Sequence, residues 1–256
     1  MAKNNIKTNW DYTILSHHYD LRADYSKLLV KKILKQIKCQ KNYPVADIGA
    51  GTAKLTKLLC ENNLIVSAIE PNKNMRFYGE KNTKKFSNVN WSAGTGEDTT
   101  LKSNSVYCVF FGSSFNTMNY KKAFKEIKRI TIKNGFFCCM WNHRNLKNIH
   151  QKNIEKIIKS HLPHYSYGDR RLDYKKMLSK ENSLLNVRKI IQSFTLKINK
   201  KDFIKAWKSH GTLRRNCKSL TQFNKIISSI TDYIRSFRND YVEVPYDNVA
   251  YLARLK

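Results

Sequence analysis

The chain has 256 residues, and its 48 lysines and arginines outnumber its 19 aspartates and glutamates, which gives a formal net charge of +29. The basic residues are spread along the whole sequence, so a solvated, lysine-coated surface explains the charge more simply than a nucleic-acid site, although nucleic-acid binding stays open. The six cysteines form no C-x-x-C pair and no H-E-x-x-H string occurs, so we expect no metal centre and no redox pair.

The hydropathy pattern suggests a cytoplasmic protein. Residues 1–9 are polar, and no unbroken apolar run reaches the roughly 18 residues that a membrane span needs. Free thiols in apolar segments are typical of a reducing compartment. We therefore expect a cytoplasmic chain without a membrane partner.

The N-terminal part of the chain predicts a helix. Asp24 is expected to cap a helix from Tyr25 to about Lys38, because an aspartate side chain accepts hydrogen bonds from the first free N–H groups. The apolar side of this helix would consist of Leu28, Leu29, Ile33, Leu34 and Ile37.

Apolar strands then alternate with helices as far as residue 141. The strands are expected at residues 44–48, 64–70, 89–93, 105–112 and 135–141, and the helices at 52–62, 74–85 and 120–132. Such alternation predicts an α/β fold with a mainly parallel sheet covered on both faces.

The rhythm changes after residue 141. A helix at 146–161 is followed by an irregular, tyrosine-rich run at 162–174, a strand at 187–198, helices at 201–210 and 220–238, and a last strand at 241–255. We interpret residues 1–256 as one domain, with an N-terminal helical lid at 1–40, a cofactor-binding core at 41–145, and a lid with C-terminal strands at 146–256.

A glycine turn after the first strand is the strongest functional signal. A dinucleotide-binding turn would carry a third glycine where Lys54 stands, and the P-loop string G-x-x-x-x-G-K-[ST] is absent. Asp47, Gly49 and Gly51 remain as an acidic-x-G-x-G pattern, whose bare backbone suits a ligand without phosphates. Glu70 ends the next apolar strand, at about the 20-residue offset of an acid that binds ribose hydroxyls.

This pattern resembles motif I of the class I S-adenosylmethionine (SAM) methyltransferases, with Ala53 in place of the third motif glycine. The resemblance implies a Rossmann-like fold with an antiparallel last strand, a helical N-terminal lid and an inserted lid after the fifth strand. Gly94-Thr95-Gly96-Glu97 resembles the family's adenine-binding G-T-A-E turn, and Tyr19-x-x-Arg22-x-x-Tyr25 resembles its N-terminal lid. The fifth strand ends in Trp141-Asn142-His143-Arg144, similar to the W-N-x-R of a small-molecule subfamily.

The resemblance assigns roles to individual residues. Phe115, Asn116, Asn142 and Tyr19 would act at the reacting centre, where Asn142 orients the acceptor or the amino group of SAM and an aromatic ring faces the sulfonium. Arg22 suits the methionine carboxylate. The SAM-binding residues would be Tyr19, Arg22, Asp47, Gly49, Gly51, Glu70, Gly96, Glu97 and Gly112.

The expected acceptor is a small molecule. The run Gly112-Ser113-Ser114-Phe115-Asn116 matches neither the Asn/Asp-Pro-Pro-Tyr nor the Pro-Cys string of nucleic-acid base methyltransferases. We expect methyl transfer to a nitrogen, oxygen or carbon of a specialised metabolite. The pocket for it would be formed by Tyr165, Tyr167, Tyr174, Trp207, Ser209 and Tyr246, whereas His17, His18 and His210 favour surface or packing roles.

Two alternatives remain open. In a water-free pocket the amino group of SAM could attack its own side chain, which would release methylthioadenosine and give azetidine-2-carboxylate, because a fold does not fix a reaction. The chain could also be a nucleic-acid methyltransferase or a polyanion-binding protein.

Overall fold

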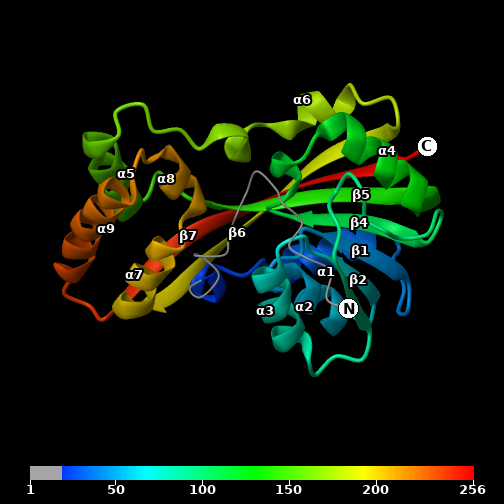
Figure 1. The fold of residues 1–256 in the computed structure, drawn as a ribbon, viewed down its shortest axis with the longest axis horizontal. Coiled ribbons are helices and arrows are strands. Elements are labelled where there is room, and N and C mark those ends of the chain that lie inside the picture. Colours follow the sequence, from blue (N-terminus) through cyan, green and yellow to red (C-terminus); the bar gives the residue numbers. More distant parts are fainter. Residues whose placement is uncertain (1–18) are drawn as a thin grey trace.

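The computed structural model describes residues 19–256. In this part of the chain a seven-stranded sheet has the order β3-β2-β1-β4-β5-β7-β6 (Figure 1). Strands β1 to β5 are parallel, and β7 is antiparallel to both β5 and β6. The expected Rossmann-like α/β fold with an antiparallel last strand is thereby confirmed. The strands are β1 Pro44–Ile48, β2 Ile65–Ile69, β3 Val89–Ser92, β4 Val106–Gly112, β5 Thr131–Arg144, β6 Leu184–Asn199 and β7 Tyr241–Leu255.

Helices cover both faces of the sheet, with α1 and α2 on one side and α4 and α6 on the other (Figure 1). The short helices α6 and α8 were not predicted, because six residues are too few to show an apolar period. The helices are α1 Lys27–Gln36, α2 Lys54–Glu61, α3 Lys73–Thr83, α4 Tyr120–Ile130, α5 Ile149–His161, α6 Tyr174–Ser179, α7 Lys200–Lys208, α8 Gly211–Asn216 and α9 Leu220–Arg235. Among residues 19–256, none of these helices has the length and apolarity to cross a membrane.

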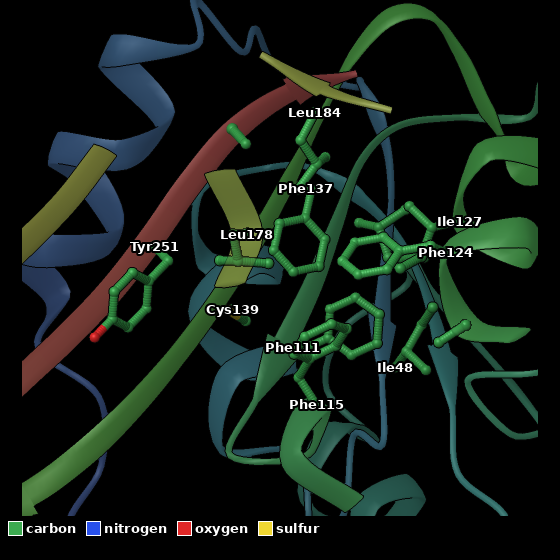
Figure 2. Packing of buried hydrophobic residues seen from close by; sticks show 14 of the residues in the cluster. Ile48, Phe111, Phe115, Phe124, Ile127, Phe137, Cys139, Leu178, Leu184 and Tyr251 are labelled. Carbon is green, nitrogen blue, oxygen red and sulfur yellow. The ribbon is translucent and has the colours of Figure 1, made fainter. Parts of the chain in front are cut away.

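An aromatic cluster fills the core between the sheet and α4 (Figure 2). The ring of Phe115 lies 5.1 Å from the rings of both Phe111 and Phe137, and its side chain is fully buried. Leu178 of α6 and Leu184 of β6 close the cluster. This packing fixes the segment that follows β4, which lies next to the glycine turn.

Four helices form a cap on the extended ends of β6 and β7 (Figure 1). Helix α5 comes from the insertion between β5 and β6, whereas α7, α8 and α9 come from the insertion between β6 and β7. Ile154, Trp207, Ile226 and Val244 belong to one buried apolar cluster that joins both insertions. The cap is therefore built from two insertions that share a core.

The start of α1 differs from the prediction. Ser26 is the N-cap, since its hydroxyl accepts from the amide of Leu29 at 3.3 Å, and the helix begins at Lys27. Asp24 forms an ion pair with Lys54 at 2.7 Å instead. Leu28 was expected on the apolar side but is 60% exposed, whereas Leu29 is fully buried. Segment 19–25 is thus tied to the glycine turn rather than wound into the helix.

Candidate functional site

Three residues of the turn between β1 and α2 have left-handed backbone. The φ angles are +70° at Gly49, +59° at Gly51 and +74° at Ala53. A Cβ on Gly49 would lie 2.4 Å from the Cβ of Ser114, so this glycine is needed for space as well as for conformation. The turn brings bare backbone to the carboxyl end of the sheet, where open α/β folds bind ligands.

Ala53 carries strain that a third motif glycine would not. It is buried, and for an L-residue left-handed backbone costs about 1 kcal/mol. We expect Ala53→Gly to raise the free energy of unfolding by about 0.5–1 kcal/mol, measured by urea denaturation. The control is Ala46→Gly, in strand β1 with ordinary backbone, which should lower stability. A loss of stability in both variants would contradict this account.

Glu70 holds the glycine turn from the end of β2. Its carboxylate accepts hydrogen bonds from the amides of Gly51 and Asn72, each at 2.9 Å. Burial raises the pKa of Glu70 to about 7, although both amides act in the opposite direction. This carboxylate fixes the backbone conformation in which Gly51 lines the pocket described next.

A pocket opens over the glycine turn between the sheet and the cap. Its walls come from segment 19–25, the glycine turn, the ends of β4 and β5, the insertion after α5, and helix α7. Of the predicted site residues, the following line it: Tyr19, Arg22, Asp47, Gly49, Gly51, Gly112, Asn142, Tyr167, Trp207 and Tyr246.

Segment 19–25 is fixed over this pocket by side chains of three elements. The ammonium of Lys54 donates to the carbonyl of Asp20 at 2.9 Å as well as to the carboxylate of Asp24. The amide of Asn82 donates to the carboxylate of Asp20. The amide nitrogen of Asn142 donates to the carbonyls of Ala23 and Asp24 at 2.9 and 3.0 Å. The segment therefore forms one wall of the pocket.

Two buried oxygen atoms in the pocket wall have no hydrogen-bond partner. The carbonyl oxygens of Ala23 and Asp24 can only accept hydrogen bonds, so the amide nitrogen of Asn142 must face them. The amide oxygen of Asn142, Oδ1, then has no partner. Asp47 uses Oδ2 to accept from the Thr56 hydroxyl at 2.7 Å, and its Oδ1 is also unpartnered. Burial raises the pKa of Asp47 to about 7. Both atoms lack a donor, which a bound ligand can supply.

Other predicted site residues lie outside the pocket wall. Phe115 and Tyr174 belong to the aromatic core, where Tyr174 stacks on Trp141 at 4.6 Å. Asn116 accepts from the indole of Trp141 at 2.9 Å, and the Ser209 hydroxyl donates to the carbonyl of Ala206. These side chains are held by partners within the fold. Glu70, Gly96, Glu97 and Tyr165 also lie outside the wall.

The predicted adenine turn is occupied by protein contacts. Glu97 accepts from the amide of Asn119 at 2.7 Å, and a Cβ on Gly96 would lie 2.1 Å from the sulfur of Met118. Glycine at this position therefore lets the Met118 side chain lie against the turn.

Several basic residues of the pocket were not among the predicted site residues. Arg144, Arg170, Arg171 and Lys54 line it together with Arg22. Burial and the charges of Arg171 and Arg170 lower the pKa of His143 to about 4. Burial and four arginines, Arg144 foremost, lower the pKa of His210 far below its usual value. His17 and His18 lie outside the described residues.

Comparison with known proteins identifies the core. Residues 46–139 match the family described as "Methyltransferase domain". Residues 46–139 therefore carry a methyltransferase domain. An uncharacterized methyltransferase of Mycobacterium tuberculosis is 31% identical to it over 101 residues, which is 40% of each chain. Demethylmenaquinone methyltransferase of Staphylococcus carnosus is 27% identical over 141 residues, covering 53% of this chain and 56% of the relative. The chain thus spans only about half, or less, of these curated relatives.

Solved structures of methyltransferases have a fold similar to that of this chain. A protein of Anaeromyxobacter dehalogenans, described as a presumed type II methyltransferase, superposes with a TM-score of 0.66 at 13% identity and covers 91% of this chain and 97% of its own. Haemonchus contortus phosphoethanolamine N-methyltransferase 2, in complex with phosphomonomethylethanolamine and S-adenosylhomocysteine, gives 0.54 at 13% identity, covering 94% of this chain and 56% of its own. At such identities the likeness concerns the fold alone.

Proposed function

We propose that the pocket binds SAM and that the protein transfers the methyl group of SAM to a small molecule. The observation that carries the proposal is the pair of unpartnered acceptors, Asp47 Oδ1 and Asn142 Oδ1, beside the glycine turn. An α-ammonium group supplies the donors that both atoms lack. Arg22, in the same wall, suits the α-carboxylate, so the residues present fit the amino-acid end of SAM.

The remaining contacts follow from the resemblance to the family. Glu70 would bind the ribose hydroxyls with the lone pairs that its two amide contacts leave free. The turn at Gly96 and Glu97 would meet the adenine once Met118 moves. Tyr19, which lines the pocket, would face the sulfonium with its ring, a contact worth about 0.5–2 kcal/mol.

When bound, SAM supplies an electrophilic methyl group. The task of the protein is to hold the acceptor in line with it and to exclude water. Segment 19–25 and the cap form two walls of the pocket, which Asn142, Tyr167, Trp207 and Tyr246 also line. The name of the Staphylococcus carnosus relative, demethylmenaquinone methyltransferase, supports an acceptor that is neither a protein nor a nucleic acid.

The sulfur product of the reaction tests this proposal. We expect the purified protein to leave SAM intact when alone and to form S-adenosylhomocysteine when a small-molecule extract is added, with one metabolite gaining a methyl group, measured by mass spectrometry. Methylthioadenosine from SAM alone would identify the cyclisation reaction instead. Methylation of transfer RNA but of no metabolite would contradict a small-molecule acceptor. Absence of SAM binding in isothermal titration would overturn the cofactor assignment.

A further inference from the structure

The part of the pocket where we place the methyl acceptor is basic. Arg144 ends β5, Arg170 and Arg171 belong to the insertion after α5, and all three line the pocket. SAM carries one carboxylate but two positive groups, an ammonium and a sulfonium. Its binding therefore adds positive charge to a pocket that already holds these arginines, and the acceptor has to offset that charge.

Arg144 has no carboxylate partner among residues 19–256. Its guanidinium carbon lies 3.8 Å from the ring centroid of Trp207, and Nη2 lies 2.5 Å from Nε2 of His210. The amide of Leu213 points at Nδ1 of the same imidazole at 3.0 Å. Because the lowered pKa keeps His210 neutral, its ring has one acceptor nitrogen for these two donors. One donor in this group is left without an acceptor.

Arg171 is in a similar position. One of its N–H groups donates to the carbonyl of Arg144 at 2.8 Å, and its guanidinium lies 4.3 Å from the ring centroid of Tyr167. Within the described part of the chain no carboxylate pairs with it, and the nearby Glu155 accepts from the Tyr167 hydroxyl. Burial lowers the pKa of Arg171, which is the signature of a partly desolvated cation.

Two buried neutral donors lie beside these arginines. Trp207 lines the pocket and only 2% of its surface is exposed. Its buried indole N–H has no hydrogen-bond partner. The hydroxyl of Tyr165 is likewise buried without a partner, and the charges of Arg144 and Arg170 act on it. Cations without a carboxylate partner, together with buried N–H and O–H groups without an acceptor, are best satisfied by a ligand that brings oxygen atoms and negative charge.

We infer that the acceptor molecule carries an oxyanion, a carboxylate or a phosphate, which binds between Arg144 and Arg171 against Trp207. This inference rests on the proposed function, since it names the substrate class of the same pocket. Guanidinium groups bind both kinds of oxyanion through paired N–H groups. An acceptor with a positive charge at this end would be repelled.

The test measures anion binding to the wild-type protein saturated with S-adenosylhomocysteine. Isothermal titration with inorganic phosphate and, separately, with benzoate distinguishes the two oxyanions. We expect one of them to bind, and Arg171→Gln and Arg144→Gln each to weaken it at least about tenfold while the affinity for S-adenosylhomocysteine stays within about twofold. Arg188→Gln is the control, because it removes the same charge from an exposed position on β6 outside the pocket.

The outcomes separate the two proposals. If S-adenosylhomocysteine does not bind, the proposed function fails. If S-adenosylhomocysteine binds but neither anion does, only the oxyanion site is overturned. The same holds if Arg188→Gln lowers the anion affinity as much as Arg171→Gln does. If the pocket variants do not fold, binding to the wild-type protein tests the inference. Benzoate should then bind at least about tenfold more tightly than neutral benzamide, or phosphate at least about tenfold more tightly than chloride at the same ionic strength. Equal binding overturns the inference.

Discussion

Gly49→Ala is expected to lower the free energy of unfolding by about 3 kcal/mol and to abolish SAM binding. The new Cβ would lie 2.4 Å from Cβ and 2.9 Å from Oγ of Ser114. Ser114 cannot move away, because it is buried and its hydroxyl bonds the carbonyl of Ile48. Left-handed backbone adds about 1 kcal/mol and overpacking about 1–3 kcal/mol. Urea denaturation and isothermal titration measure the two effects.

Gly168→Ala is the matched control for this variant. Gly168 also has left-handed backbone, with φ +56°, but no atom lies within 4 Å of the position of its Cβ. Only the backbone cost of about 1 kcal/mol should appear, with SAM affinity retained. Equal losses in the two variants would show that the contact with Ser114 does not explain the effect at Gly49.

Asp47→Asn is expected to weaken SAM binding by about 1.5–3 kcal/mol, the value of a hydrogen bond to a charged group, or roughly 10- to 150-fold. The cause is loss of the negative charge that would receive the ammonium.

The wild type should also show a pH dependence of SAM binding. Burial holds the pKa of Asp47 at about 7, so this carboxyl group is largely protonated at pH 6 and ionised at pH 8. SAM affinity should therefore rise with pH up to about 7 and level off above it, by at most tenfold per unit.

Titrations between pH 6 and 8 check this prediction, and Thr56→Val is its control. The Thr56 hydroxyl donates to Asp47 and lowers its pKa, so removing the hydroxyl should shift the rise in affinity to higher pH. In Asp47→Asn the rise should shrink to the part contributed by Glu70, whose pKa burial also raises to about 7. A wild-type affinity that does not change over this range would contradict an ionised Asp47 at the ammonium.

Local patterns predicted the fold well and the glycine turn correctly, because each strand, helix and turn of residues 44–141 carries its own signal. Asp47, near the end of β1, and Gly49 and Gly51 of the turn that follows lie within five residues of one another, so their placement at the pocket followed from the spacing alone. The cap of α1 was misassigned, since Asp24 and Ser26 are both good caps and the choice depends on Lys54, a long-range partner.

The basic end of the pocket could not be predicted in the same way. Arg144 and Arg171 are 27 residues apart, and His210 is 66 residues from Arg144. They meet because two insertions share one apolar core, and no local pattern encodes that packing. For Phe115 and Tyr174 the sequence was misleading. Their positions in the sequence predicted site residues, but in the structure their rings are buried in the aromatic core.

The ties that hold segment 19–25 bear on the order of events at the pocket. Lys54, Asn82 and Asn142 bind its backbone and carboxylates from three different elements, and Asn142 does so with the same amide whose oxygen has no partner in the protein. Opening this wall breaks several hydrogen bonds together and would also disturb the proposed contact of Asn142 with the ammonium of SAM. If SAM binds as proposed, release of S-adenosylhomocysteine requires segment 19–25 to loosen, and we expect product release to be the slowest step of turnover.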